Sequence, residues 1–452
     1  MRLHTAPLLL ITALTAAAQQ PAPVSASAQF QAIQSRLRAS HAASDWLANL
    51  AAAQDQQALL NDDPAALLEV ARAEVHIRDV HLNGDVAAIR ELQQFVRMGQ
   101  STDFIEKTPD FATLRNRPEY ADLQRDMAAN RAPIALAATA LVLPDANLLA
   151  EDIDVDTARH RFLITSVREH KIVAVSVTNS ASGPAAITDF APAPDPWPIV
   201  AIKIDRTRSR VWATESAMQG LSFSPKSDWG RTAVLCYDLR TGKLLRRVEG
   251  PHGSAFGDML LLPNGDVIVS DGDGGGLYRL ASNPASPDHL DRIDHGEFIS
   301  PQTPALAPDG HRLFVPDYER GLAILDLTTQ KVSWLAPQGR FALNGIDGLY
   351  CNRNQLIAVQ NGTSPERVIL FTLDAPLATI VSEKIIERAT PTLGDPTHGV
   401  LIGRDFYYIA NSGWDILDAH GNINSGAKPS QPRIMRATVP GPQPSTGSSP
   451  RQ

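Results

Sequence analysis

Six short apolar segments recur at a nearly constant interval along most of this chain, and no other feature limits its fold as strongly. Successive starts lie 49, 56, 46, 43 and 51 residues apart, and the segments are FLITSV, VWATES, VIVSDG, LFVPDY, LIAVQN and YYIANS, beginning at Phe162, Val211, Val267, Leu313, Leu356 and Tyr407. Each has an apolar segment before it and another after it, with turn sequences such as PNGD and PDGHR between. A unit of strand, turn, strand, loop and strand repeated at this period predicts the blades of a β-propeller.

Six copies predict a mainly β fold, a six-bladed β-propeller over residues 133–440. The segment IALAATALVLP precedes the first copy and is expected to add an outer strand to the last blade. That strand would close the ring, because the first and last sheets otherwise expose unpaired edges. Residues 441–452 are rich in Pro, Ser and Gly and are predicted to form a disordered tail.

The chain ahead of the propeller has helical periodicity over residues 28–131. Apolar residues recur three and four apart in DPAALLEVARAEVHIRDV and NGDVAAIRELQQFVRMG, and NGD joins the two as in a pair of antiparallel helices. The region resembles the end of tetratricopeptide-like domains, through Gly84, Asp85, Asp110, Phe111, Leu114, Arg115, Pro118, Tyr120 and Leu123. Such a unit either offers a groove to a protein partner or packs as a plain helical domain, and these residues leave both open.

The first 18 residues have the layout of a cleavable signal peptide, with Arg2 ahead of an apolar run and small residues after it. We therefore expect a periplasmic or secreted protein, and no later apolar run is long enough for a membrane span. The net charge of −8 gives no reason to expect nucleic acid as a partner. The two cysteines, Cys236 and Cys351, lie in apolar segments and are expected to be buried thiols, although their spacing leaves a disulfide open.

Polar residues stand at the starts of several predicted first strands, which line the channel of a propeller. They are Glu151, Asp258, Gln302 and Asp347, from four different blades. Hard oxygen donors on rigid elements are what a divalent cation requires. The sequence therefore predicts a metal site here, and the alternative is that these side chains only accept hydrogen bonds from channel water and backbone.

The repeat series resembles the senescence-marker-protein/gluconolactonase family, also called luciferin-regenerating-enzyme-like, over Leu148–Val439. The stretches that carry the likeness are EDIDVDTARHRFLITSVREHKIVAV, GDMLLLPNGDVIVSDGDGGGLYRL, SPQTPALAPDGHRLFVPDYERGLAILDL, NGIDGLY with IAVQNG, and DPTHGV with FYYIANSGW. The resemblance implies one divalent metal in the channel, calcium first, with zinc, manganese or magnesium as alternatives. It also implies a lactone as substrate, whose carbonyl the metal polarises.

By the same resemblance Glu151 and Asp347 match the acidic ligands of the family, and Asp258 and Gln302 occupy the places of its two amides. Asp347, or a water on the metal, would then drive ring opening. The chain departs from the family pattern, since Glu-Asp-Ile replaces the usual Glu-Gly-Pro and Gln302-Thr303 replaces an Asn-Gly. An acid in place of an amide at Asp258 adds negative charge, which favours cation binding and weakens Lewis acidity.

Further polar residues are candidates for a substrate pocket above the metal. They are Glu215, Asn344, Asn361 and Asn411, with Trp414 beside the last of these. His398 begins the sixth blade and is a candidate catalytic acid or base, with a structural hydrogen-bonding role as the alternative. The long loop SAMQGLSFSPKSDWGR is expected to cover the channel mouth.

The glycine-rich stretch GDGDGGG lacks the spacing of a calcium loop and no helix follows it, so Asp266, Asp271 and Asp273 are predicted to cap turns. The chain contains no GxSxG, HExxH or Walker sequence. We therefore expect an exported gluconolactonase-like propeller that hydrolyses a lactone or related ester. The alternative is a non-catalytic scaffold or ligand-binding protein of the cell envelope that binds a protein partner through its helical domain.

Overall fold

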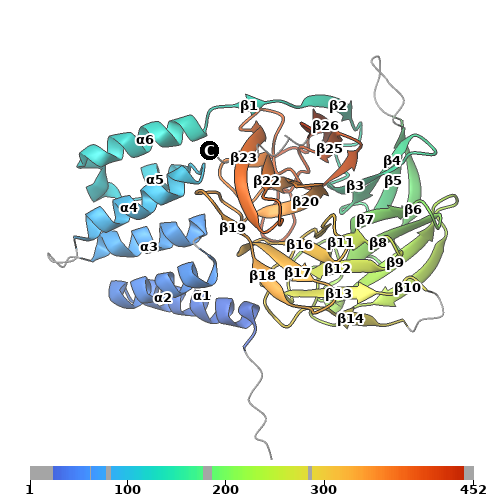
Figure 1. Ribbon diagram of the computed structural model, residues 1–452, viewed down its shortest axis with the longest axis horizontal. Coiled ribbons are helices and arrows are strands. Elements are labelled where there is room, and N and C mark those ends of the chain that lie inside the picture. Colours follow the sequence, from blue (N-terminus) through green and yellow to red (C-terminus); the bar gives the residue numbers. More distant parts are fainter. Residues whose placement is uncertain (1–23, 62, 78–82, 177–185, 284–287, 442–452) are drawn as a thin grey trace, which may run out of the picture.

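The computed structural model describes residues 24–441 except 62, 78–82, 177–185 and 284–287. The predicted signal peptide lies outside the described residues, and so does the predicted tail apart from residue 441. The described chain forms a stack of helices beside a ring of six sheets (Figure 1). The mainly β, six-bladed propeller predicted from the repeats is confirmed.

The helical unit consists of α1 (Ala26–Ala42), α2 (Trp46–Leu59), α3 (Pro64–His76), α4 (Gly84–Arg97), α5 (Asp103–Lys107), the 3-10 helix η1 (Ala112–Asn116) and α6 (Pro118–Asn130). Side chains of Ser25, Asp45 and Asp63 accept backbone hydrogen bonds at the first turns of α1, α2 and α3. Leu92, Phe95, Phe111 and Leu123 belong to its buried core. Among the described residues no helix is long and apolar enough to cross a membrane.

Each blade is built on antiparallel strands that follow one another in the chain, and strands from elsewhere in the chain join the fifth and sixth blades. The first contains β3 (Ala150–Asp156), β4 (Arg161–Ser166), β5 (Lys171–Ser176) and β6 (Ile187–Pro192), and the second β7 (Ile199–Asp205), β8 (Arg210–Ser216), β9 (Thr232–Asp238) and β10 (Leu244–Glu249). The third contains β11 (Phe256–Leu261), β12 (Val267–Asp271), β13 (Gly276–Leu280) and β14 (Leu290–Arg292), and the fourth β15 (Ala305–Leu306), β16 (Arg312–Asp317), β17 (Gly321–Asp326) and β18 (Val332–Trp334). The fifth contains β20 (Ile346–Asn352), β21 (Gln355–Gln360), β22 (Arg367–Leu373) and β23 (Thr379–Arg388), and the sixth β24 (Gly399–Ile402), β25 (Asp405–Ile409) and β26 (Arg433–Thr438).

A strand from ahead of the first blade completes the sixth, as the sequence predicts. β2 (Ala138–Val142) pairs antiparallel with β26, so that Ala138 lies opposite Arg436. This pairing closes the ring and leaves no open edge between the first and last blades. The short strands β1 (Ile134–Ala135) and β19 (Ala336–Pro337) both pair with β23 of the fifth blade.

Apolar side chains between neighbouring blades hold the ring together. Trp212 of the second blade packs in one buried cluster with Met259 and Val269 of the third. The acids of the glycine-rich stretch serve the turns: Asp271 accepts from the backbone of Ala255 and Gly274, and Asp266 accepts from the backbone of Ser282. Turn capping by these two acids is therefore confirmed. Cys236 and Cys351 are free thiols.

The first strands of four blades carry register shifts near their starts. The shifts fall between Ala150 and Ile153, between Ile199 and Ile202, between Phe256 and Asp258, and between Ile346 and Gly348. A bulge re-aims side chains next to it and is common beside functional sites. Glu151, Asp258 and Asp347 all lie at these bulges, at the end of the channel that we call the mouth.

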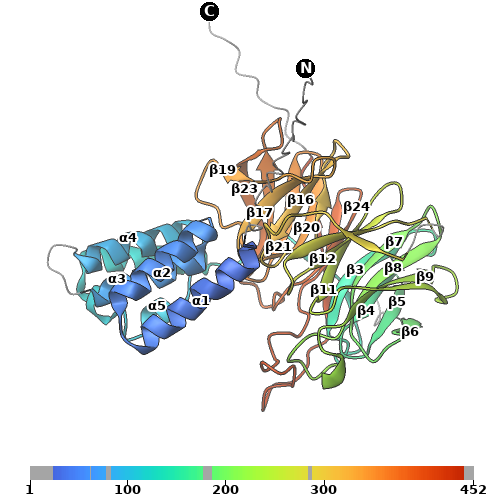
Figure 2. The same cartoon turned by 90° about the horizontal axis from the view of Figure 1, so that it is seen from below.

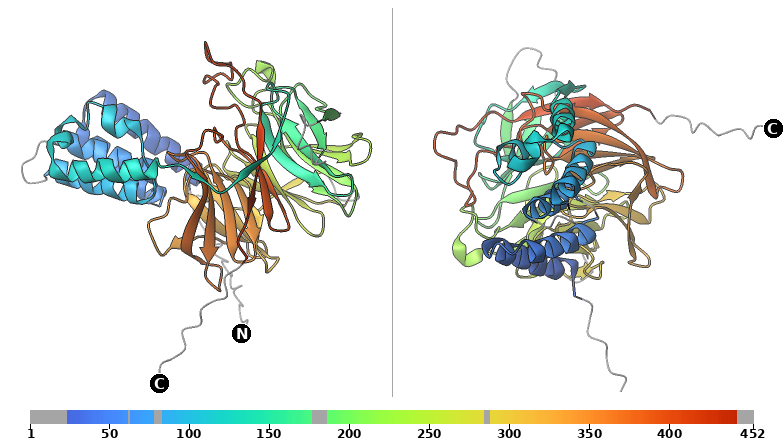
Figure 3. Two further views of the ribbon diagram at one scale, coloured as in Figure 1. Left: turned by 90° about the horizontal axis from the view of Figure 1, so that it is seen from above. Right: turned by 90° about the vertical axis from the view of Figure 1, so that its left-hand side faces the viewer.

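The helical unit docks on the fourth and fifth blades (Figures 2 and 3). Asn61 donates to the carbonyl of Arg320, in the β16–β17 turn, and Arg320 donates back to the carbonyl of Leu59. Arg388, at the end of β23, donates to the carbonyls of Ala129 and Ala132 after α6. The unit is thus fastened to the propeller along its length and is not a free appendage.

Candidate metal centre

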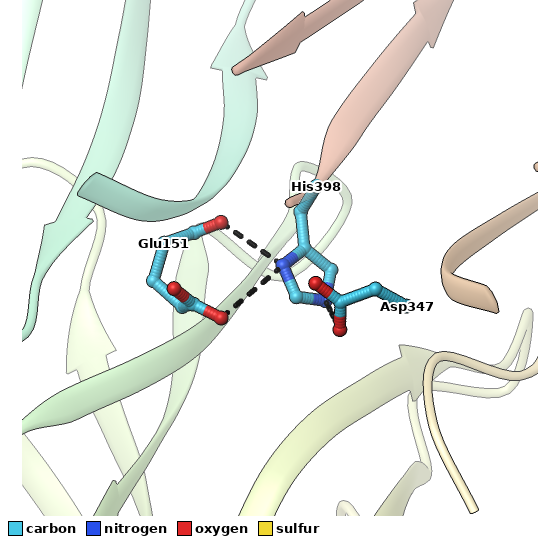
Figure 4. Close-up of side chains that lie close together, drawn as sticks. All are labelled: Glu151, Asp347 and His398. Atoms are coloured by element: carbon cyan, nitrogen blue, oxygen red, sulfur yellow. Dashed lines mark hydrogen bonds and ion pairs between the residues drawn. The ribbon is translucent and has the colours of Figure 1, made fainter. Parts of the chain in front are cut away.

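Three side chains from the first, fifth and sixth blades meet in the channel. Glu151, Asp347 and His398 each offer one ligand atom, and these atoms lie within 4.8 Å of one another (Figure 4). His398 Nδ1 lies 3.8 Å from Glu151 Oε1, and His398 Nε2 lies 3.7 Å from Asp347 Oδ1. The side chains are 9%, 11% and 2% exposed respectively, so the group is almost sealed from solvent.

The imidazole of His398 is fixed at both nitrogens. Nδ1 lies 2.9 Å from the backbone carbonyl of Glu151, which can only accept, so Nδ1 carries a hydrogen. Nε2 lies 2.6 Å from Asp258 Oδ1. Thr303 Oγ1 donates to the same oxygen of Asp258. Asp258 and Thr303 therefore join the group, which we name the channel cluster: Glu151, Asp258, Thr303, Asp347 and His398.

Neighbouring side chains orient the two outer carboxylates. Asn361 Nδ2 donates to Asp347 Oδ2 over 2.9 Å, and the hydroxyl of Tyr318 donates to Asn361 Oδ1 over 3.0 Å. Trp414 Nε1 donates to Glu151 Oε2 over 2.5 Å. Each carboxylate therefore has one oxygen held by a donor, which leaves the other oxygen available toward the centre of the cluster.

The channel cluster holds more buried negative charge than its own residues balance. Burial, and then the charge of Asp347, raise the pKa of Glu151 well above its ordinary value. Burial likewise raises the pKa of Asp347 to about 6, although His398 lowers it. Burial lowers the pKa of His398, but Asp347 and Asp258 more than reverse this, and its pKa lies well above the usual value. The carboxylates of Glu151, Asp258 and Asp347 thus all lie near the imidazole of His398, which is the cationic group of the channel cluster.

The donor set fits a divalent metal ion. An ion of charge +2 would relieve the excess of carboxylates, whose cost of ionisation is otherwise set by burial and mutual repulsion. Carboxylate oxygens and an imidazole nitrogen are ligands that zinc and manganese accept. Nδ1 is committed to the carbonyl of Glu151, so an ion would bind through Nε2, which would have to exchange its 2.6 Å contact with Asp258 Oδ1 for the ion. Oxygens of Glu151 and Asp347 would complete the set.

Four of the predicted site residues lie elsewhere. The amide nitrogen of Gln302 donates to the carbonyl and the hydroxyl of Ser300, and among the described residues it does not bind the channel cluster. The fully buried side chain of Glu215 pairs with Arg247 of β10 at 2.9 Å, and burial raises its pKa to about 7. Two asparagines complete the set: Asn344 lines a cavity beneath the helical unit, and Asn411 binds Ser430 and Gln431 within the sixth blade.

The sequence prediction did not select Thr303 or Tyr318 as site residues. Thr303 is the next residue after Gln302. In a regular strand the two side chains would point to opposite faces, so strand alternation is the pattern that could have indicated which of them faces the channel. That signal was weak, because β15 begins only at Ala305 and the residues before it are irregular. Trp414 was noted beside Asn411 but not selected, and nothing local marks its contact with Glu151, 263 residues away.

The channel continues past the cluster as an apolar cavity of about 280 Å³. Its walls include the residues two positions after the members of the channel cluster, namely Ile153, Leu260, Ala305, Leu349 and Val400. Asp154 and Lys203 also line this cavity, and most of its other walls are apolar, so polar residues at the mouth give way to mainly apolar ones farther along. The cluster thus forms a polar layer between the mouth and this apolar segment.

Loops of the second and sixth blades meet at the mouth. Phe223, in the predicted covering loop, contacts Trp414 edge to face with ring centroids 5.8 Å apart. The backbone of Ser222 donates to the carbonyl of His420. Since Trp414 binds Glu151 directly, the covering loop reaches the channel cluster through this indole.

The fold and the site together define a six-bladed β-propeller with a docked helical unit and a buried carboxylate and histidine cluster in its channel. No family model matches the sequence, and no curated protein matches it. The chain is similar in structure to a calcium-binding protein, regucalcin, from Agrobacterium tumefaciens, with 14% identity, a TM-score of 0.45, and coverage of 68% of this chain and 96% of that one.

Two other solved structures are similar to the same extent. A luciferin-regenerating enzyme has 12% identity and a TM-score of 0.47, with coverage of 68% of this chain and 95% of that one. Virginiamycin B lyase from Staphylococcus aureus has 12% identity and a TM-score of 0.43, with coverage of 67% and 99%. These matches describe the fold alone.

Proposed function

We propose that the channel cluster binds one divalent metal ion and that the protein hydrolyses a lactone or related ester at this site. The observation that carries the proposal is the meeting of ligand atoms from Glu151, Asp347 and His398 within 4.8 Å inside a channel. When bound, the ion would supply a Lewis acid that polarises the ester carbonyl. The resemblance to gluconolactonase-like proteins supports the choice of a lactone.

The residues of the chain have separate roles in this proposal. Glu151, Asp347 and His398 Nε2 would hold the ion, with Nε2 exchanging its contact with Asp258 for the ion, and Thr303 would keep its hydrogen bond to the Asp258 carboxylate. Asp347 Oδ1 is the proton acceptor for the attacking water, because Asn361 occupies Oδ2 of the same carboxylate. Trp414 covers Glu151 and limits access of bulk water.

The nitrogen donor bears on which metal the site prefers. Calcium takes six to eight oxygen ligands in general, whereas zinc and manganese accept imidazole nitrogen. The sequence resemblance placed calcium first, and the position of His398 favours zinc or manganese instead. Metal analysis of the purified protein distinguishes these ions directly.

Turnover of a lactone panel by the full-length protein tests the proposal. We expect hydrolysis that is lost in a chelator, restored by zinc or manganese, and lost in Asp347→Ala. Gln302→Ala is the matched control, because its amide contacts Ser300 and not the channel cluster. Full activity in the chelator, or in Asp347→Ala, would remove the mechanism.

A second candidate function is partner binding by the helical unit. A groove of about 640 Å³ is lined by the apolar Phe30, Leu68 and Phe104, the basic Arg38 and Arg72, and the acidic Glu69 and Glu319. Phe104 is 40% exposed and stands at the wall of this groove. We propose an apolar protein segment as the occupant, and Phe104→Glu should abolish its capture if this groove binds it.

Export remains part of the proposal and rests on the first 18 residues of the sequence. Sequencing the N-terminus of the mature protein tests it. A start shortly after the small residues that follow the apolar run is expected, and an intact Met1 on protein from the extracellular or periplasmic fraction would contradict cleavage.

A further inference from the structure

The loop that follows α4 and the turn between β21 and β22 bind each other at the edge of the channel mouth. We propose that this contact makes the helical unit a working part of the channel site, because it positions the residues that orient Asp347 and lead to His398. The inference rests on the proposed metal site for its functional meaning. It assigns positioning roles to Gln100 and Ser364, which touch neither metal nor substrate.

The contact consists of three direct hydrogen bonds around one serine. The backbone of Ser101 donates to the carbonyl of Ser364 over 2.5 Å, and Ser364 Oγ donates to the carbonyl of Ser101 over 2.6 Å. The backbone of Ser364 donates to Gln100 Oε1 over 3.1 Å. Gln100 is 2% exposed and Ser101 is 3% exposed, whereas Ser364 is exposed, so these bonds are sheltered on the side of the helical unit and lie at the rim of the contact.

A buried arginine also joins the loop after α4 to the β21–β22 turn. Arg367, at the start of β22, is fully buried and donates from Nη1 to the carbonyl of Met98 and from Nε to Gln360 Oε1. Gly99 permits this approach, because its φ is +77° and a Cβ there would lie 2.6 Å from Arg367 Nη1. Residues 98–101 of the helical unit therefore contact the β21–β22 turn at Ser364 in its middle and at Arg367 at its end.

The turn held in this way contacts two strands of the channel cluster. Asn361, at its start, donates to Asp347 Oδ2 over 2.9 Å. Glu366, at its end, accepts from the backbone of Asp395 over 2.8 Å. Asp395 lies three residues before His398 in the same irregular segment ahead of β24. One turn thus fixes an oxygen of Asp347 and the segment that delivers the imidazole.

A helical unit that served only as a separate binding module would have no need of these bonds. Because the turn is irregular and lies between two strands, its geometry depends on the contacts made at its middle, and Ser364 stands there. Loss of two of the bonds should let the turn open more often, by roughly tenfold for each 1.4 kcal/mol removed. Asp347 and His398 would then be less well oriented. Loss of a residue that orients a metal ligand weakens metal binding by about 10- to 100-fold.

The test uses the full-length protein and the double variant Gln100→Ala/Ser364→Ala. We expect hydrogen exchange of the backbone over residues 361–366 to accelerate by about tenfold and the dissociation constant for Mn²⁺, measured by calorimetry, to rise by about tenfold. Tyr120→Phe is the matched control, since it removes a buried hydrogen bond to Ile105 inside the helical unit, away from the turn. Exchange over 361–366 and Mn²⁺ affinity should be unchanged in this control.

Unchanged exchange over residues 361–366 in the double variant would overturn the inference, whether or not the wild-type protein binds metal. Faster exchange with unchanged Mn²⁺ affinity would refute the link from the turn to the site. If the wild-type protein binds no metal, the proposed function fails separately, and faster exchange over residues 394–398 in the double variant then decides whether the turn positions the His398 segment. The single variant Ser364→Ala gives the same comparison if the double variant does not fold.

Discussion

Replacing Asp347 by asparagine should change stability in opposite directions with and without metal. The pKa of Asp347 is raised from 3.8 to about 6. Burial is the largest cause and the charge of Asp258 adds to it, whereas the charge of His398 lowers the pKa. The folded protein therefore holds this proton more tightly than the unfolded chain does. Stability is lost as the pH rises through this interval, and the whole loss is present at pH 8. Asp347→Asn removes the ionisation and should make the metal-free protein more stable at pH 8.

The magnitude follows from the two pKa values. A shift from 3.8 to about 6 corresponds to at most roughly 3 kcal/mol at pH 8. For a chain of 452 residues the entropy of unfolding is about 1 kcal/mol per degree, so the metal-free variant should unfold about 3 °C higher. An ion present at about 100 times its dissociation constant adds about 2.7 kcal/mol to the wild type, which is also about 3 °C. Asp347→Asn should lose most of the stabilisation that the ion gives to the wild type.

Thermal and urea unfolding at pH 5 and pH 8, in chelator and in Mn²⁺, measure both effects. Asp238→Asn is the matched control, because hydrogen bonds from Thr241 lower the pKa of that exposed turn carboxylate. It should slightly destabilise the protein at pH 8 and leave the response to metal intact. If metal-free Asp347→Asn is less stable than the wild type at pH 8, or gains as much from Mn²⁺, the electrostatic account of the channel cluster is wrong.

Three further changes test separate parts of the site. Glu215→Gln should reduce the loss of stability between pH 5 and pH 8 by roughly 3 kcal/mol in urea unfolding, because burial raises the folded pKa of Glu215 to about 7 from 4.5 and its ionisation destabilises the fold as the pH rises. Thr303→Val should weaken Mn²⁺ binding by about tenfold, whereas Gln302→Ala should change it less than twofold, and equal effects would contradict the assignment of Thr303. Asn361→Ala should weaken Mn²⁺ binding by about tenfold in a competition assay, and unchanged affinity would show that Asp347 needs no such support.

The sequence was informative about the fold because each repeat corresponds to one blade and the number of repeats gives the number of blades in the ring. Apolar cores at a near-constant interval specify both the blade and the number of blades, and each local turn agrees with the same answer. The closing strand β2 was also predictable, since an apolar segment without a blade of its own has one unpaired edge to join. The exact strand ends were not predictable, because loops of different length separate the blades.

The channel cluster was predictable in part. Glu151, Asp258 and Asp347 were expected together, and the structure brings them together around His398, which the sequence placed only as a candidate acid or base. The fourth expected ligand does not join them, because the residue that reaches Asp258 is Thr303. Alternation along a strand assigns a face only where the strand is regular, and these residues lie at bulges or ahead of the first ladder. A shift of one residue in the expected alternation is therefore enough to select Gln302 in place of its neighbour Thr303.

The relation between the two units was not predictable by any local pattern. Gln100 and Ser364 are 264 residues apart, and each lies in a short polar segment that reads as an ordinary loop. Under our inference, their contact gives the helical unit a role at the channel site, and partner binding by the same unit is a separate proposal. Since the turn that it holds also holds Asp347 and the segment leading to His398, the orientation of the unit and the geometry of the site are linked. A partner seated in the helical groove would then act on the same structure that carries the metal ligands.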